Sequence, residues 1–230
     1  IGLVGTNSDH STNRMLLQYI QKHFSDKTDI EIVEIKDLPI FNKPADMQIP
    51  AEAKALAEKI EAADGVIIST PEYDHAVPAS LMSALSWLSY GIYPFVDKPV
   101  MITGASYGVL GSSRAQAHLR QILDAPELKA RIMPSSEFLL SHSLQAFDTD
   151  NNLKNPDQVQ ELEGLFEDFQ MFINIMKQLS HTHAAHVKAA ENFSWENNSA
   201  TCSTWRFCKL RTSLCSIRVM TKQTAPLCKS

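Results

Sequence analysis

Two short segments of the chain are apolar at every position, with no polar residue between the apolar ones. One is a Val-Ile-Ile run that begins at Val66, and the other is a Val-Met-Ile run that begins at Val100. A strand with one face in water alternates polar and apolar residues, whereas a strand of a parallel sheet is covered on both faces by helices. The two runs therefore predict central strands of a parallel sheet, which restricts the chain to an α/β fold.

Strand and helix patterns alternate along the first 176 residues. Strands are predicted at residues 1–5, 30–35, 65–70 and 98–104 and within residues 132–140, and helices at residues 16–24, 51–63, 79–89, 114–123 and 159–176. Five such units predict a flavodoxin-like three-layer α/β/α sandwich with a five-stranded parallel sheet in the order 2-1-3-4-5. Residues 30–35 alternate partly, which suits an edge position for the second strand.

The composition changes sharply near residue 196. The first 196 residues hold all 26 acidic residues, 15 basic ones and no cysteine, which gives them a net charge of −11. Residues 197–230 hold the other six basic residues and all four cysteines. We therefore predict a flavodoxin-like domain over residues 1–180 and an atypical, disordered tail over residues 181–230.

The same numbers limit the function. A net charge of −5 argues against a general nucleic-acid-binding protein. No segment has the roughly 18–20 consecutive apolar residues of a membrane span, and a domain without cysteine indicates a cytoplasmic protein. Three histidines between His181 and His186 lack an adjacent acidic or cysteine partner, and the cysteines form no C-x-x-C pair, so no metal site is predicted.

Three loops follow strands 1, 3 and 4 and should meet at the carboxyl edge of the sheet. The first loop, residues 6–13, is rich in Ser, Thr and Asn and opens a helix, so its N–H groups and hydroxyls are suited to a phosphate. It contains neither G-x-x-x-x-G-K-[ST] nor G-x-G-x-x-G, which argues against NTP hydrolysis and against a Rossmann dinucleotide loop. The same side chains are also suited to capping the helix, and the two roles are compatible.

The second loop, residues 71–78, and the third loop, residues 105–113, are less specific. The second combines an aromatic residue, two acids and a histidine between two prolines, a composition suited to the edge of a flat heteroaromatic ring. The third contains Gly104-Ala-Ser-Tyr-Gly108, which matches the G-x-S-x-G elbow of serine hydrolases, with Asp124 and His142 formally available for a triad. Because residues 110–113 prolong this loop before its helix, we treat hydrolysis as the less favoured alternative.

Taken together, the loops resemble the NADPH-dependent FMN reductase family of flavodoxin-like proteins over about residues 1–176. The resemblance implies that FMN and NADPH or NADH are the cofactors, with no catalytic acid or base required. It also implies a phosphate site and a ring site, formed by Thr6, Ser8, Ser11, Thr12, Asn13, Pro71, Glu72, Tyr73, Asp74, His75, Ser106, Tyr107 and Gly108. The family usually has Asn at the position of Asp74, whose charge would then lie near the flavin pyrimidine edge.

The resemblance also implies an activity. Hydride from NAD(P)H would pass to FMN, and two electrons would then pass to a small-molecule acceptor such as a flavin or a quinone. The second alternative is a flavodoxin-like electron carrier without NAD(P)H activity, a class that is typically acidic. Family members commonly pair near the flavin, so a homodimer or homotetramer that uses residues 87–93 is expected.

Overall fold

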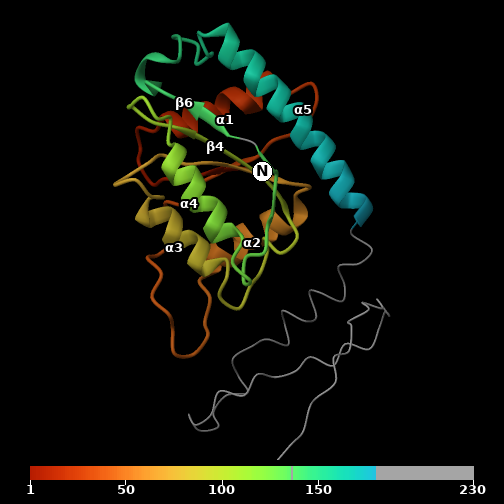
Figure 1. The fold of residues 1–230 in the computed structure, drawn as a ribbon. Coiled ribbons are helices and arrows are strands. Elements are labelled where there is room, and N and C mark those ends of the chain that lie inside the picture. Colours follow the sequence, from red (N-terminus) through yellow and green to blue (C-terminus); the bar gives the residue numbers. More distant parts are fainter. Residues whose placement is uncertain (136, 180–230) are drawn as a thin grey trace, which may run out of the picture. The chain divides into compact units, whose positions relative to one another are not determined.

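The computed structural model describes residues 1–135 and 137–179, which all belong to one compact unit. The predicted tail, its four cysteines and the histidines from His181 lie outside the described residues. The elements are β1 (Gly2–Val4), α1 (Thr12–His23), β2 (Ile32–Val33), α2 (Ala51–Ala62), β3 (Val66–Ser69), α3 (Ala79–Trp87), β4 (Pro99–Ala105), α4 (Ser113–Leu123), β5 (Arg131–Ile132), β6 (Phe138–Leu140), a 3-10 turn (Ser143–Gln145) and α5 (Pro156–Leu179) (Figure 1).

The sheet is parallel throughout, and its order β2-β1-β3-β4-β5 confirms the predicted topology. β3 and β4 lie in the middle, as their uninterrupted apolar runs predict, and every residue of both strands is buried. β2 is an edge strand, which agrees with its partly alternating pattern. The helices between consecutive parallel strands carry the chain back across the sheet, so all the strands end on the same side.

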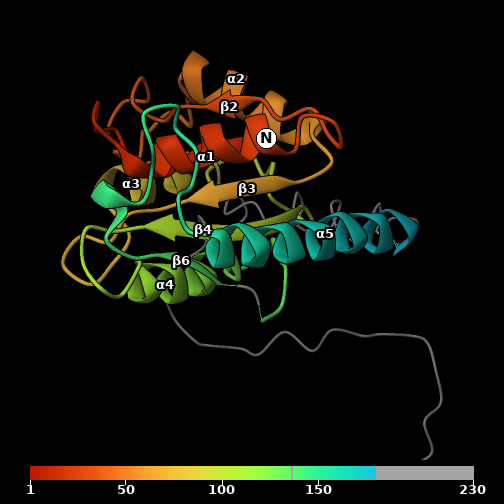
Figure 2. The same cartoon turned by 90° about the horizontal axis from the view of Figure 1, so that it is seen from above.

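Helices cover both faces of the sheet (Figure 2). One core lies under α2, α3 and α4, and the other lies under α1 and α5. Successive residues of β3 alternate between the two cores, because Val66 and Ile68 join the first and Ile67 joins the second. This alternation is why a central strand needs an apolar residue at every position.

The predicted fifth strand is divided into two pieces. β5 pairs with the start of β4 and β6 pairs with its end. Val100 pairs with Ile132 and Thr103 pairs with Phe138, so β4 advances by three residues while its partner advances by six. Pro134 has no N–H to give to the ladder and Ser135 has a φ of 56°, which interrupts the pairing between β5 and β6.

Candidate functional site

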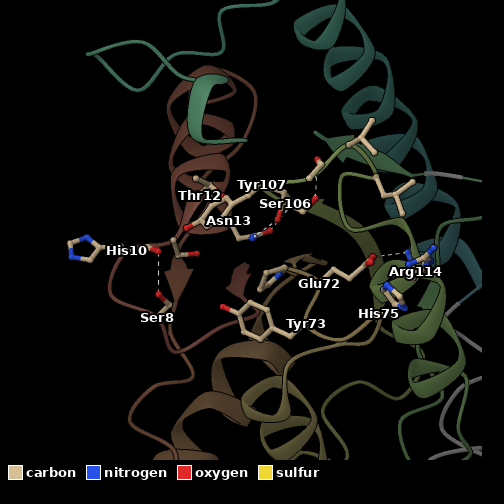
Figure 3. Close-up of a pocket in the computed structure, with 16 residues that line it drawn as sticks. Ser8, His10, Thr12, Asn13, Glu72, Tyr73, His75, Ser106, Tyr107 and Arg114 are labelled. Carbon is tan, nitrogen blue, oxygen red and sulfur yellow. Dashed lines mark hydrogen bonds between the residues drawn. The ribbon is translucent and has the colours of Figure 1, made fainter. Parts of the chain in front are cut away.

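A cavity of about 500 Å³ lies where the three loops meet, at the carboxyl ends of β1, β3 and β4. Figure 3 shows its lining, to which all three loops contribute. Of the residues predicted from the sequence, the cavity is lined by Ser8, Ser11, Thr12, Asn13, Pro71, Glu72, Tyr73, His75, Ser106, Tyr107 and Gly108. Thr6 and Asp74 do not line it. The volume falls within the range of about 300–1,000 Å³ that is typical of small-molecule sites.

The helix α1 begins at this cavity. Ser11 is the N-cap, and its hydroxyl accepts from the N–H of Arg14 at 3.3 Å. Within the described part of the chain, the N–H groups of residues 10–13 donate to no protein group. Four such donors at the positive end of a helix can bind an anion. Capping therefore uses the hydroxyl of Ser11 and the N–H of Arg14, whereas the N–H groups suited to an anion are those of residues 10–13.

Asn13 holds the ends of two strands together and is buried. Its amide donates to the carbonyl of Ala105 at 2.9 Å. Its carbonyl oxygen accepts from the N–H of Ala105 at 2.9 Å and from the hydroxyl of Ser69 at 2.9 Å. The carbonyl oxygen and one N–H of the side-chain amide are thus engaged with the protein, which leaves the second amide N–H and the backbone N–H of this residue for a ligand.

The two threonines predicted in the first loop also bond to protein groups. Thr6 is 1% exposed, and its hydroxyl accepts from the N–H of Ser8 at 3.2 Å. Thr12 and Ser143 share a buried hydrogen bond of 2.8 Å between their hydroxyls. Thr6 therefore orients the loop from behind the cavity.

The second loop forms a two-residue hairpin. Tyr73 and Ala76 exchange two backbone hydrogen bonds of 3.1 and 2.9 Å, and Asp74 and His75 between them have φ values of 50° and 64°. Two consecutive positive φ values define a type I′ turn, which favours Asn, Asp and Gly. Asp74 is exposed at this turn and lies outside the cavity lining. The backbone conformation by itself therefore accounts for an Asn or Asp at this position.

Glu72 connects the second loop to the helix that follows the third. One oxygen of its carboxylate accepts from the N–H groups of Arg114 at 3.0 Å and Ala115 at 3.2 Å, at the start of α4 (Figure 3). The N-cap residue of that helix, Ser112, has a φ of 72° and no side-chain cap bond. A carboxylate from a distant loop therefore serves as the cap.

The third loop contains two glycines that differ in the space around them. A Cβ placed on Gly108 would meet no atom within 4 Å, whereas one on Gly104 would lie 2.5 Å from the carbonyl oxygen of Thr70. Gly104 is thus required by the packing between β4 and its neighbours. Gly108 leaves space beside the cavity that the protein itself does not fill.

The geometry does not favour the hydrolase interpretation of this loop. Ser106 is followed by six more residues before α4 begins, whereas a nucleophile elbow passes directly into its helix. The hydroxyl of Ser106 donates to the carbonyl of Gly108 at 3.4 Å. It bonds to no imidazole among the described residues.

Five lining residues were not predicted: His10, Ala105, Val109, Leu110 and Arg114. All five lie within the three loops or directly next to them, so the positions of the loops could have identified these residues from the sequence. Arg114 is the one residue among them with a permanent charge, and its side chain is exposed at the cavity edge. The exposed fractions of Tyr73 and Tyr107, 50% and 59%, show that two aromatic rings of the wall also face solvent.

Comparisons with known proteins consistently match this chain to reductases that use NADH or NADPH. Residues 1–145 match the model of the family described as NADPH-dependent FMN reductase. The chain is 51% identical to NADH:(hydroxy)cinnamate reductase subunit CrdA of Vibrio ruber, over 87% of this chain and 98% of that protein. It is 39% identical to NADH-dependent flavin reductase subunit 2 of Lactobacillus johnsonii, over 75% of this chain and 96% of that protein.

A solved structure shows the same likeness. The flavoenzyme NAD(P)H:(acceptor) oxidoreductase FerB of Paracoccus denitrificans superimposes with a TM-score of 0.65 at 25% identity. The match covers 77% of this chain and 96% of that one.

Proposed function

The chain belongs to the NADPH-dependent FMN reductase family, and on this premise we propose that it is an FMN-dependent NAD(P)H oxidoreductase. The observation that carries the proposal is the cavity at the carboxyl ends of β1, β3 and β4. Its lining combines N–H groups of the first loop that donate to no group among the described residues with aromatic side chains from the second and third loops. When bound, FMN would supply the redox chemistry, which is hydride acceptance from NAD(P)H and delivery of two electrons to an acceptor.

The residues present fit FMN. The phosphate requires several donors, and among the described residues the N–H groups of residues 10–13 have no protein acceptor. Ser8 and Ser11 line the cavity together with them. Gly108 also lines the cavity, and a Cβ there would meet no protein atom, so this position leaves room for the ring system.

The chain's own groups would then divide the work. The first loop binds the phosphate through its N–H groups and the hydroxyl of Ser11, and side-chain bonds of Thr6, Ser8, Thr12 and Asn13 hold that loop in place. The second and third loops line the ring through Pro71, Glu72, Tyr73, His75, Ser106, Tyr107 and Gly108. Asp74 acts through the shape of the hairpin, because its side chain is exposed outside the cavity.

The proposal extends to the acceptor and to assembly. A small molecule such as a flavin or quinone fits the open, partly aromatic mouth of the cavity. Both curated relatives described above are named as subunits, which supports a search for a second chain that works with this one. For self-association through residues 87–93, Trp87 is 4% exposed and donates to the carbonyl of Pro39, so the other residues of that segment would form the contact.

No helix among the described residues is long and apolar enough to cross a membrane. The cytoplasmic location predicted from the cysteine-free domain stays a prediction.

The deciding experiment is a visible spectrum of the purified protein with added FMN, followed by NADH or NADPH without oxygen. A bound flavin spectrum that bleaches on addition of either nucleotide is the expected result. A bound flavin that stays oxidised with both nucleotides would favour an electron carrier. Failure to bind FMN would overturn the proposal, and an ester hydrolysis assay would then test the Ser106 alternative.

A further inference from the structure

We propose that Arg14, held by Glu34, is a positioning residue that orients the first loop for the phosphate of FMN. Neither residue lines the cavity, and neither is part of the predicted site. This inference rests on the proposed function, because it concerns the same site. It is carried by a separate observation, namely the hydrogen bonds behind the loop.

The guanidinium of Arg14 lies between the first loop and the edge of the sheet. Its Nη1 donates to the carbonyl of Ser8 at 2.9 Å and to the carbonyl of Asp9 at 3.0 Å. Its Nε and Nη2 donate to the two carboxylate oxygens of Glu34 at 2.5 and 3.0 Å. This bidentate contact fixes the plane of the guanidinium, and the side chain of Arg14 is only 17% exposed. Glu34 directly follows β2, so the fixed point is the sheet itself.

Fixing these carbonyls also fixes the N–H groups. In a trans peptide the carbonyl of one residue and the N–H of the next point in opposite directions. The carbonyls of Ser8 and Asp9 point to Arg14, and the carbonyl of His10 accepts from the hydroxyl of Ser8 at 3.1 Å. The N–H groups of Asp9 and His10 are therefore turned away from Arg14, and the N–H of Ser11 is turned away from the hydroxyl of Ser8. Among the described residues, the N–H groups of residues 12 and 13 at the start of α1 also donate to no protein group.

Orientation matters here because the first loop has no cationic side chain of its own. Residues 6–13 contain no Lys or Arg, and they include the acidic Asp9. The charge of Arg14 is balanced by Glu34, whose hydrogen bond raises the pKa of the arginine and keeps it charged. A dianionic phosphate would thus be recognised mainly by aligned N–H dipoles and hydroxyls, and those dipoles lose their common direction without Arg14.

The competing explanation is that the pair only ties α1 to β2. The two explanations differ in which flavin they affect. A general loss of structure weakens FMN and riboflavin alike, whereas a disordered phosphate loop weakens FMN alone, because riboflavin has the same ring system without a phosphate. The ratio of the two dissociation constants therefore isolates the role of the loop.

The experiment measures the dissociation constants of FMN and riboflavin by flavin fluorescence, using protein from which bound flavin has been removed. The variants are R14Q, R14K and E34Q. Lys27→Gln is the matched control, because it removes the ion pair between Lys27 and Glu167 elsewhere on the molecule. The thermal midpoint of each protein is recorded alongside.

For R14Q we expect FMN binding to weaken about 10- to 100-fold, the loss that follows from two hydrogen bonds of about 1 kcal/mol each. Riboflavin binding should change by less than about twofold. R14K should recover part of the loss, since one ammonium cannot hold both carbonyls and Glu34 in one plane. E34Q should show a smaller loss in the same direction, and K27Q should leave both flavins unchanged.

An equal weakening of both flavins by R14Q, or no change in FMN binding, would overturn the inference. If R14Q does not fold, the same comparison is made with E34Q, which retains the guanidinium. These results are distinct from failure of the proposed function, in which the unmodified protein binds neither flavin.

Discussion

The two ends of the cavity are held in different ways. The first loop is held by residues of the helix that directly follows it: the capping bond to Arg14 spans three residues and the guanidinium bonds to Ser8 and Asp9 span six and five. The second loop depends on a contact between Glu72 and α4, 42 and 43 residues further along the chain. These bonds between the first loop and α1 are therefore local in sequence, whereas the bonds of the second loop join separate units of the fold.

Asn13 does not follow this contrast, because it belongs to the first loop but bonds to residues far away in the sequence. It lies in the first turn of α1, yet its partners are at the ends of β3 and β4, and Ala105 is 92 residues away. Thr12 also bonds to a distant residue, Ser143, but Asn13 is the side chain that links the first loop to the ends of both β3 and β4. The predictions below change one of the two ends at a time.

The largest effect is expected for Asn13→Ala, which removes the link between the two ends. Three buried hydrogen bonds are lost, and the N–H and carbonyl of Ala105 are left without partners. We expect the free energy of unfolding to fall by about 3 kcal/mol or more. Chemical denaturation measures it.

The control for Asn13 is Asn7→Ala, an exposed position in the same loop, which should change the stability by less than about 0.5 kcal/mol. Equal losses in the two variants would contradict the role given to Asn13.

Glu72→Ala should damage the second end. The substitution removes the carboxylate cap of α4, whose own N-cap residue supplies no side-chain bond. We expect a loss of about 1–2 kcal/mol in the free energy of unfolding. The affinity for riboflavin should also fall, since this end lines the ring.

Glu58→Ala is the matched control, because Glu58 is an exposed glutamate on α2. A stable Glu72 variant with unchanged riboflavin affinity would show that the two loops are positioned without this cap.

The Gly108→Ala variant tests the cavity wall without altering the fold. The added methyl group meets no protein atom, so the thermal midpoint should stay the same. It enters the space assigned to the flavin, and we expect the dissociation constant of FMN to rise about tenfold, which corresponds to about 1.4 kcal/mol.

Gly104→Ala should behave in the opposite way, with a loss of about 1–3 kcal/mol in stability, because its methyl group collides with the backbone at Thr70. If FMN affinity is unaffected by the change at Gly108, the ring lies elsewhere.

The smallest effect is expected for Asp74→Asn in the hairpin. Asn tolerates the positive φ at this turn, so stability should be unchanged or rise by a few tenths of a kcal/mol. The sequence predicts that the native carboxylate lowers the reduction potential of bound FMN relative to the Asn variant. The exposed position of Asp74 outside the cavity makes this shift small, since water and salt screen the charge.

A redox titration of Asp74→Asn beside Asp37→Asn, a second exposed aspartate, measures the shift in potential. A lower potential in the Asp74 variant would contradict the predicted sign.

The sequence by itself determined the sheet and the place of the cavity. The unbroken apolar runs at Val66 and Val100 identify the central strands, and strand order and burial follow from them. The three loops were located by the ends of those strands. The break in the fifth strand was visible at Pro134, although the length of the detour from the sheet was not.

Only the tertiary structure decided which atoms of those loops remain free for a ligand. The family resemblance implies that Thr6, Thr12 and Asn13 belong to the ligand site, and in the structure their side chains bond to protein groups that hold the loops. Composition gave no role to Arg14 or to Glu34. The physical reason is that periodicity and capping depend on neighbours within a few residues, which the sequence displays directly. The partner of a buried polar group depends on which distant strand or helix lies beside it, and only packing sets that.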